Sequence, residues 1–442
     1  MPLRKRQEVQ KVLRQGRLTF EMNVAMKKKP FAFSVSFFFS VLIFIACFSS
    51  CTRSSQVRSL SEEKLFSLSY GNFEEQLSLF VSNSVLTNST YIAMRDGFFY
   101  IVNGEAQKIM SLNSYGDLLS LYYNADEYAE KNPGLPEQSS VGLWKAVEYP
   151  FTFTGKMAVD SRKYMYVVAT VPRERNEQVE GENLVYSHVV LSVSSDGSSI
   201  GYIGQEGFGG TPFPYIKDVY TTENDELVVV CVTTVGLYVY WFSKDGLLRY
   251  QIPVLTQKVP RISLEQINSS LSPSDLYVTV ENVVPDCYAE RLYVKVDYYL
   301  PHIDKESRVE SGIDYIQSCI YPLGIENGVY GEGVNILPYE ESVTEDFSKI
   351  TYRLPYDFLG VTKNGWFFFI IATANNGFSI EIMQPGTQTV LKRNLDLSHK
   401  EMLYYSLSLS HDGIISALIA EKDSAEVVWW RTDALLDSIL HF

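Results

Sequence analysis

The hydrophobic pattern after residue 48 is that of short β-strands separated by tight turns. Short apolar or aromatic runs alternate with Gly, Asp, Asn and Ser, and the 3.6-residue spacing of amphipathic helices is scarce. Asp96-Gly97, Asn364-Gly365 and Asp412-Gly413 each lie between two apolar runs, where two-residue hairpins need positive φ angles. Residues 432–440 are the best candidate for a helix. The pattern predicts an all-β protein.

These strands and turns form a degenerate repeat with a period of roughly 45–60 residues. Its copies are 91–123, 156–204, 215–254, 262–321, 355–395 and 403–431. Each copy is predicted to hold four strands, and one four-stranded unit cannot bury both of its faces alone. We therefore expect residues 64–442 to form a β-propeller of about six four-stranded blades. Two β-sandwich domains are the alternative.

The best copy of the repeat resembles a known family. Residues 91–123 read YIAMRDGFFYIVNGEAQKIMSLNSYGDLLSLYY, and their order of strand, turn, YIVN, polar hairpin and LNSYGDLL resembles NHL-type propeller blades. The glycine-rich segment 204–210, with the following Thr211-Pro212-Phe213-Pro214, resembles the entry to such a blade and predicts a connection between blades. The resemblance also implies ring closure by strands from both chain ends, with 65–70 pairing with 426–430.

The first 50 residues have a different pattern, which predicts export. The basic cluster Lys27–Lys29 precedes an apolar run, 31–48, that ends at Ser49-Ser50-Cys51. A charged segment, an apolar segment and small residues before a cleavage site are the marks of a signal peptide. We expect translation to begin at Met26, so that residues 1–25 lie outside the mature fold. The candidate start residues are Met1, Met22 and Met26.

The end of this segment, Phe48-Ser49-Ser50-Cys51, resembles the lipobox of bacterial lipoproteins in the relaxed form found in spirochaetes. The resemblance implies that the Cys51 thiol carries diacylglycerol, that cleavage precedes Cys51, and that an acyl chain such as palmitate modifies the new amine. Two or three such chains anchor a protein stably. Cys47 is a second candidate for lipidation. Residues 51–63 would form a polar tether.

Two alternatives remain for the amino-terminal segment: an uncleaved membrane anchor and simple secretion. All three possibilities place the body outside the cytosol, in the cell envelope or beyond it. Because Thr52 rather than Asp follows Cys51, the lipoprotein resemblance slightly favours the outer membrane. It leaves open whether the body faces the periplasm or the surface.

The body is strongly acidic. Residues 51–442 hold 29 basic and 50 acidic side chains, a charge of about −21, whereas residues 1–50 carry about +7. Nucleic-acid binding needs clustered Lys and Arg, so this balance excludes nucleic acid as a partner. It also argues against electrostatic adhesion to an anionic bilayer. Membrane attachment is therefore expected through the lipid anchor.

The cysteines and histidines predict no metal site, cofactor or catalytic residue. Cys287 and Cys319 are candidates for a disulfide in an oxidising compartment, and Cys231 lies in an apolar run typical of a buried strand. The sequence has no C-x-x-C pair and no H-E-x-x-H. Its acidic clusters lack the ligand spacing of an EF-hand loop.

Candidate binding features are insertions and aromatic residues. Three insertions interrupt the repeat, at 124–150, 172–183 and 324–349, and long loops on a rigid scaffold are common binding sites. Tyr and Phe are abundant, and their side chains could stack on a ligand. The nominated ligand-binding residues are Trp144, Phe213, Tyr215 and Trp366.

Together these features predict a lipid-anchored envelope protein without enzymatic activity, whose propeller binds a protein partner as a scaffold. One alternative is a surface or periplasmic protein that binds carbohydrate or peptide. Another is a propeller hydrolase or lyase. Its paired carboxylates could lie far apart in sequence, so they cannot be chosen among the 50 acidic residues of the body.

Overall fold

In the computed structural model of this chain, the regular elements are almost all β-strands. Its described residues are 58–80, 89–131, 145–152, 154–178, 185–263, 276–304, 307–345, 348–373, 377–387, 389–397 and 401–440. Residues from Arg58 onward form one unit. The proposed signal peptide and lipidation site lie outside the described residues. No described helix is long and apolar enough to cross a membrane.

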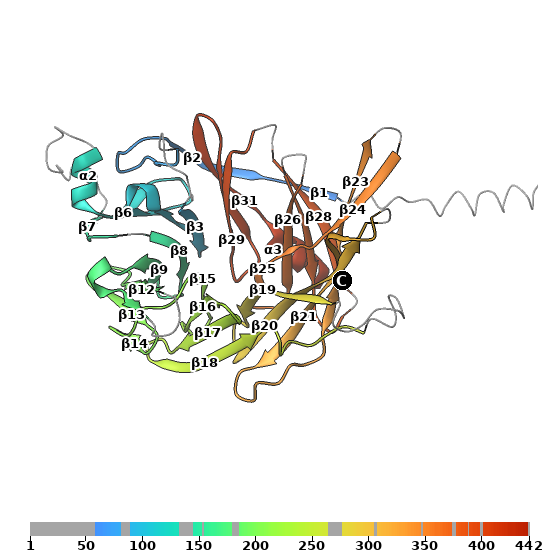
Figure 1. Cartoon of the computed structure of the whole chain (residues 1–442). Helices are drawn as coiled ribbons and strands as arrows, with labels where there is room; N and C mark the ends of the chain where they lie inside the picture. Colours follow the sequence, from blue (N-terminus) through green and yellow to red (C-terminus); the bar gives the residue numbers. More distant parts are fainter. Residues whose placement is uncertain are drawn as a thin grey trace, which may run out of the picture. The chain divides into compact units, whose positions relative to one another are not determined.

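Six sheets follow one another along the chain and form the six blades of a β-propeller (Figure 1). Their strands pair antiparallel except for two parallel edge strands, β7 on β6 in blade 1 and β1 on β28 in blade 5. Blade 1 contains β3 (Thr90–Arg95), β4 (Phe98–Asn103), β5 (Lys108–Leu112), β6 (Leu118–Tyr123) and β7 (Lys145–Glu148). Blade 2 contains β8 (Thr154–Val159), β9 (Met165–Thr170), β12 (His188–Val193), β13 (Ile200–Gly204) and β14 (Gly207–Phe208). Blade 3 contains β15 (Ile216–Thr221), β16 (Leu227–Thr233), β17 (Gly236–Phe242) and β18 (Leu248–Leu255).

The remaining blades use both ends of the described chain. Blade 4 contains β19 (Tyr277–Pro285), β20 (Arg291–Ile303), β21 (Glu310–Gly324) and β22 (Val334–Ile336). Blade 5 contains β25 (Asp357–Val361), β26 (Phe367–Thr373), β27 (Gly377–Met383), β28 (Val390–Asp396) and β1 (Arg58–Ser61). Blade 6 contains β29 (Tyr404–Leu409), β30 (Ile415–Ala420), β31 (Ser424–Trp430) and β2 (Glu63–Ser69). The predicted propeller is confirmed, and the pair of β-sandwiches is excluded.

The ring closes where the resemblance placed the closure. Strand β2 pairs antiparallel with β31, and Figure 1 shows blue β2 beside red β31. The inner strand of blade 6, β29, contacts β3 of blade 1. The predicted carboxy-terminal helix is α3 (Thr432–Leu440). Part of the predicted tether is strand instead, because Arg58–Ser61 form β1, which pairs parallel with β28, and Glu63 begins β2.

The hydrophobic core lies between neighbouring blades. Each of six clusters of buried side chains joins two adjacent blades, such as Ile101 of blade 1 with Val427 of blade 6. The same arrangement joins Val230 of blade 3 to Val294 of blade 4. Because both faces of every sheet are covered, the strands are apolar on both sides and follow no strict alternation. This explains the near-continuous apolar runs in the sequence.

The inner strands β3, β8, β15, β19, β25 and β29 surround the propeller axis, and their residues define its two ends. We call the end where they begin, with Tyr91, Lys156, Lys217, Asp357 and Tyr405, the Lys156 end. The end where they turn into the next strand, with Arg95, Glu223 and His411, is the Arg95 end.

Most of the inserted elements lie at the Lys156 end. Helix α2 (Ala125–Lys131) follows β6, and the hairpin of β10 (Glu177–Gln178) and β11 (Val185–Tyr186) connects β9 to β12. The hairpin of β23 (Tyr339–Glu345) and β24 (Ser348–Leu354) connects β22 to β25. Two 3-10 turns, Gly104–Ala106 and Arg173–Arg175, complete the regular elements.

Candidate functional site

A central cavity of about 380 Å³ runs along the propeller axis and is lined by all six inner strands. Its volume is at the lower end of the range of small-molecule sites in proteins. Its wall combines apolar side chains, such as Met157 and Val219, with charged and polar side chains near both ends. The Arg95 end and the Lys156 end of the cavity differ in how many of their charged side chains contact one another across the channel.

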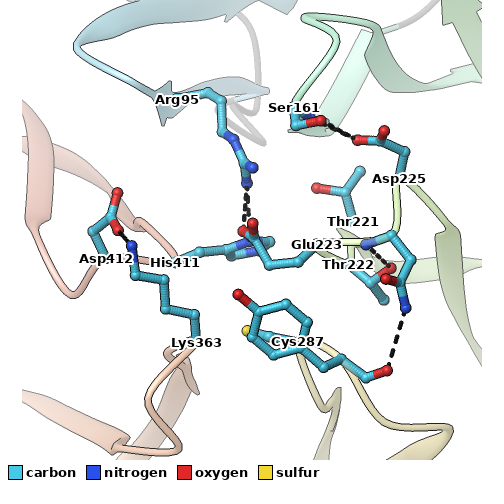
Figure 2. Close-up of polar contacts among 12 residues, drawn as sticks. Arg95, Ser161, Thr221, Thr222, Glu223, Asp225, Cys287, Lys363, His411 and Asp412 are labelled. Atoms are coloured by element: carbon cyan, nitrogen blue, oxygen red, sulfur yellow. Dashed lines mark hydrogen bonds and ion pairs between the residues drawn. The ribbon is translucent and has the colours of Figure 1, made fainter.

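Three charged or ionisable side chains from three blades meet at the Arg95 end (Figure 2). His411 of blade 6 contacts Glu223 of blade 3 through Nδ1 and Oε1. Arg95 Nη1 of blade 1 lies 3.1 Å from the same Glu223 oxygen and 2.9 Å from His411 Nδ1. The three side chains are only 10–20% exposed. They therefore span the channel and couple blades that are not sequential.

The electrostatics of this cluster favour an ionised Glu223. The hydrogen bond with His411, with the nearby charge of Arg95, lowers the pKa of Glu223 to about 2 despite its partial burial. The pKa of the neighbouring Cys287 shifts the other way, because burial raises the pKa of its thiol to about 12. Cys287 Sγ donates to the Val361 carbonyl at 3.3 Å. It is thus a protonated donor at neutral pH and poorly suited as a nucleophile.

Turn-to-turn contacts at the Arg95 end link each blade to the next. They are Lys163 with Asp96, Ser161 with Asp225, Glu223 N with Cys287 O, Cys287 Sγ with Val361 O, Lys363 N with His411 O, and Arg95 with His411. Every pair of neighbouring blades is represented, so the contacts complete a ring. The most direct interpretation of the Arg95 end is therefore structural closure.

The Lys156 end is more open, and its charged groups line a mouth. Lys156 Nζ lies 2.7 Å from Asp218 Oδ2, and Lys217 Nζ donates to the Glu281 carbonyl oxygen. The side chain of Lys156 is 39% exposed, and Asp357 is also exposed. Asp218 supports a charged Lys156, whose pKa is raised above its ordinary value although burial opposes this. Access to the cavity is therefore expected from this end.

An ion cluster lies behind this mouth, within blade 4. Lys295 of β20 is fully buried, and its Nζ lies 2.7 Å from Asp297 Oδ1 and 3.4 Å from Glu281 Oε2. Ser318 donates to Asp297 at 2.5 Å. A buried lysine needs such partners, because removing a charge from water without compensation is very costly. The cluster fixes the position of Glu281 at the cavity wall.

The structure corrects two of the four nominated ligand-binding residues. Phe213 is fully buried between blades 2 and 3, where its ring packs edge-on against Tyr240. Trp366 is 1% exposed and lies in the core of blades 5 and 6. Tyr215, in contrast, is exposed at the Lys156 end and contacts His188 edge-on. Trp144 lies outside the described residues.

The nominated disulfide is also wrong, because Cys287 and Cys319 are both free thiols. Cys319 of β21 is in register with Val296 of β20, which pairs with Val280 of β19. Cys287 follows the far end of β19, several residues of about 3.3 Å each from Val280. A disulfide requires Cα atoms within about 7 Å, so this placement excludes the bond. Cys231 is a buried, free strand residue.

Sequence reasoning missed the residues of both channel ends. Arg95 and His411 each stand directly before a predicted turn, Asp96-Gly97 or Asp412-Gly413. Because equivalent turns of every blade meet at one end of a propeller, their charged neighbours could have been grouped on that basis. No comparable local signal marked Lys156 or Asp357, which simply begin two inner strands.

Among the described residues, no group of three or more His, Cys, Asp or Glu side chains is placed to hold a metal ion.

No protein-family model and no curated protein matches the sequence. A gluconolactonase from Xanthomonas campestris aligns with a TM-score of 0.37 and 10% identity, over 77% of this chain and 86% of that one. An ulvan lyase aligns with a TM-score of 0.38 and 11% identity, over 84% of this chain and 83% of that one.

The β-propeller domain of the Trilobed protease from Pyrococcus furiosus aligns with a TM-score of 0.38 and 8% identity, over 78% of this chain and 95% of that domain. Similarities this weak say nothing about the activity of the present protein. Its candidate site is therefore defined by its own geometry: a cavity braced at the Arg95 end and accessible from the Lys156 end.

Proposed function

We propose that this protein is a lipid-anchored scaffold of the bacterial cell envelope that binds a protein partner at the Lys156 end. The observation that carries the proposal is the hairpin of β20 and β21 in blade 4. Tyr299 of β20 pairs with Tyr277, the first residue of β19. Beyond this pair, β20 and β21 continue as a two-stranded hairpin to the pair Ile303 and Glu310. A projecting hairpin on a rigid ring is well placed to meet another protein.

The extension of this hairpin presents apolar side chains to solvent. Ile303, Val309 and Ile313 are each at least half exposed. Exposed branched aliphatic residues grouped on one element are typical of interaction sites rather than of ordinary surface. The other inserted elements, α2 and the hairpins β10–β11 and β23–β24, lie at the same end of the propeller.

The surroundings indicate what kind of partner would fit. Acidic side chains accompany the apolar ones on these hairpins, including Glu310, Asp314, Glu340 and Glu341. A partner surface that combines apolar and basic residues would complement them. The same charges would repel an anionic bilayer, so the contact is proposed with a protein and the membrane attachment with the lipid on Cys51.

The proposal is tested by crosslinking in intact cells that produce the full chain, followed by mass spectrometry of the captured proteins. We expect a stoichiometric envelope partner with the wild type and at least about tenfold less of it with the double variant Ile303→Ser/Ile313→Ser. The matched control is Leu247→Ser, because Leu247 is an exposed aliphatic residue of a turn at the Arg95 end.

Thermal unfolding of the purified variants shows whether each one folds as the wild type does. Equal capture of the same partner by the wild type, the double variant and Leu247→Ser would place the interface elsewhere. Failure of the wild type to capture any envelope protein would contradict the scaffold function itself.

A further inference from the structure

The mouth of the central cavity has more negative than positive charge. Five charged side chains line the cavity at the Lys156 end: Lys156, Lys217, Asp218, Glu281 and Asp357. Three are carboxylates and two are ammonium groups. Lys295 and Asp297 lie behind this wall and compensate each other at 2.7 Å. The surplus is therefore one negative charge in a confined space.

The ammonium groups are already engaged, whereas two of the carboxylates are not fully compensated. Lys156 pairs with Asp218, and Lys217 donates to the Glu281 backbone. Glu281 Oε2 is buried and accepts no hydrogen bond in the described part of the chain, with Lys295 at 3.4 Å as its ion-pair partner. Asp357 has no ion-pair partner among the described residues.

We propose that the cavity binds an alkylammonium group, which Glu281 and Asp357 hold at the Lys156 end while the alkyl chain lies along the apolar wall. An ammonium supplies the donors and the positive charge that these carboxylates lack. Apolar side chains deeper in the cavity, including Met157, Val219 and Leu407, suit an alkyl chain. This site does not rest on the proposed scaffold function.

The pKa shifts of the two carboxyl groups agree with this assignment. Loss of contact with water at the cavity wall raises the pKa of the Glu281 carboxyl above the ordinary carboxylate range, and in the same direction that of Asp357, although the Asp357 side chain is partly exposed at the mouth. Their ionised forms are thus costly in the cavity wall, and a bound cation would offset that cost. An anionic ligand would add to the surplus charge. A neutral ligand would leave it uncompensated.

The alkylammonium group has two possible sources, a free amine and the lysine side chain of a protein. Isothermal titration calorimetry of the purified chain distinguishes them with four probes. These are n-butylamine, n-butanol, Nα-acetyl-lysine methylamide and Nα-acetyl-norleucine methylamide. We expect one molecule of each amine probe to bind per chain, and neither of the neutral probes to bind.

The variant that tests the site is Asp357→Asn, which keeps the size of an exposed side chain and removes its charge. We expect its affinity for both amine probes to fall at least about tenfold, because a charge-assisted contact is lost. The control is Asp245→Asn, the same change on an exposed turn at the Arg95 end. Its affinity should equal that of the wild type.

The outcomes are separable. Tighter binding of Nα-acetyl-lysine methylamide than of n-butylamine would indicate a protein lysine as the natural source, and the reverse would indicate a free amine. Equal binding by Asp357→Asn and the wild type, binding of the neutral probes, or no binding of either amine would overturn the proposal. Failure of the wild type to capture any envelope protein, with intact amine binding, would contradict only the scaffold function.

Discussion

Glu223 lies between two basic side chains that belong to other blades, and this placement makes one carboxylate important for the whole ring. His411 contacts its Oε1, and Arg95 lies 3.1 Å from the same atom. Because the side chain is only 19% exposed, solvent screens these interactions weakly. Removing the charge leaves two basic groups without their shared partner.

The variant Glu223→Gln tests this contribution. The folded pKa of about 2 lies below the ordinary value of 4.5, so the stabilisation is present above about pH 4.5 and is lost as the pH falls towards 2. We expect Glu223→Gln to lower the free energy of unfolding by about 1–3 kcal/mol at pH 7. The difference from wild type should shrink as the pH falls from 4.5 to 3.

Urea unfolding at pH 7, 5, 4 and 3 measures this difference. The matched control is Glu340→Gln, because the Glu340 side chain is 62% exposed on the hairpin of β23 and β24. It should unfold with wild-type stability at every pH. A Glu223→Gln deficit that stays constant down to pH 3 would show that the carboxylate contributes through shape rather than through charge.

At the scale of single residues, the sequence predicted environments poorly. Phe213 and Trp366 were nominated for binding, yet both lie in the core, whereas Tyr215 is exposed. Aromatic side chains suit a buried strand and a stacking surface equally well. Which of the two applies depends on the position of the neighbouring blade, and no local pattern contains that information. Lys156 and Asp357 at one channel end were missed for the same reason, whereas Arg95 and His411 precede predicted turns and could have been grouped through them.

Elements were predicted far better than residue environments, because turns and apolar runs are local signals. Asp96 and Gly97 both have positive φ angles, as the predicted two-residue hairpin requires. The turns at Asn364-Gly365 and Asp412-Gly413 are longer, and only their glycines have positive φ. All six predicted repeats correspond to blades. The elements that were missed are helix α2, the short edge strands β1, β7 and β14, and the hairpin of β23 and β24. Strand β1, with the sequence RSLS, is as polar as a linker.

Strand β2 closes the ring, and Phe66 is central to that closure. Phe66 is 8% exposed and packs edge-on against Phe99 of blade 1. A Cβ atom on Gly116 would lie only 2.8 Å from the Phe66 side chain, so the turn there has room for glycine alone. The contact between the amino-terminal strand and blade 1 is therefore tightly packed.

We expect Phe66→Ala to reduce the free energy of unfolding by about 3–5 kcal/mol, because it leaves a cavity in the core. The matched control is Phe73→Ala, since Phe73 is 47% exposed and should change stability little. Chemical denaturation monitored by tryptophan fluorescence measures both. Equal stabilities for the two variants would mean that β2 does not contribute to closure in solution.

At the scale of the whole molecule, the chain combines an acidic ring with an amino-terminal segment, outside the described residues, that is predicted to anchor it. Two or three acyl chains on Cys51 would hold the body at the membrane. The ring itself, with its acidic surface, would gain nothing from an anionic bilayer. Attachment to the membrane is therefore predicted to depend on Cys51 alone.

We expect Cys51→Ala to move the protein from the membrane fraction to the soluble fraction of cells, with loss of the acylated amino-terminal peptide. Cell fractionation and mass spectrometry of that peptide measure the change. Cys47→Ala is the control, because Cys47 is the second candidate for lipidation, and it should remain acylated and membrane-bound. If Cys47→Ala loses the lipid and Cys51→Ala keeps it, cleavage occurs at the earlier cysteine.

The parallel strand β1 has a mechanical consequence for a body held at its amino terminus. A tension applied at residue 57 reaches β1 first, and only four residue pairs join β1 to β28. Strand β2, which closes the ring through six register pairs with β31, is loaded only after β1 has detached. Strand β1, at the outer edge of blade 5, can therefore detach under tension while β2 and β31 keep the ring closed.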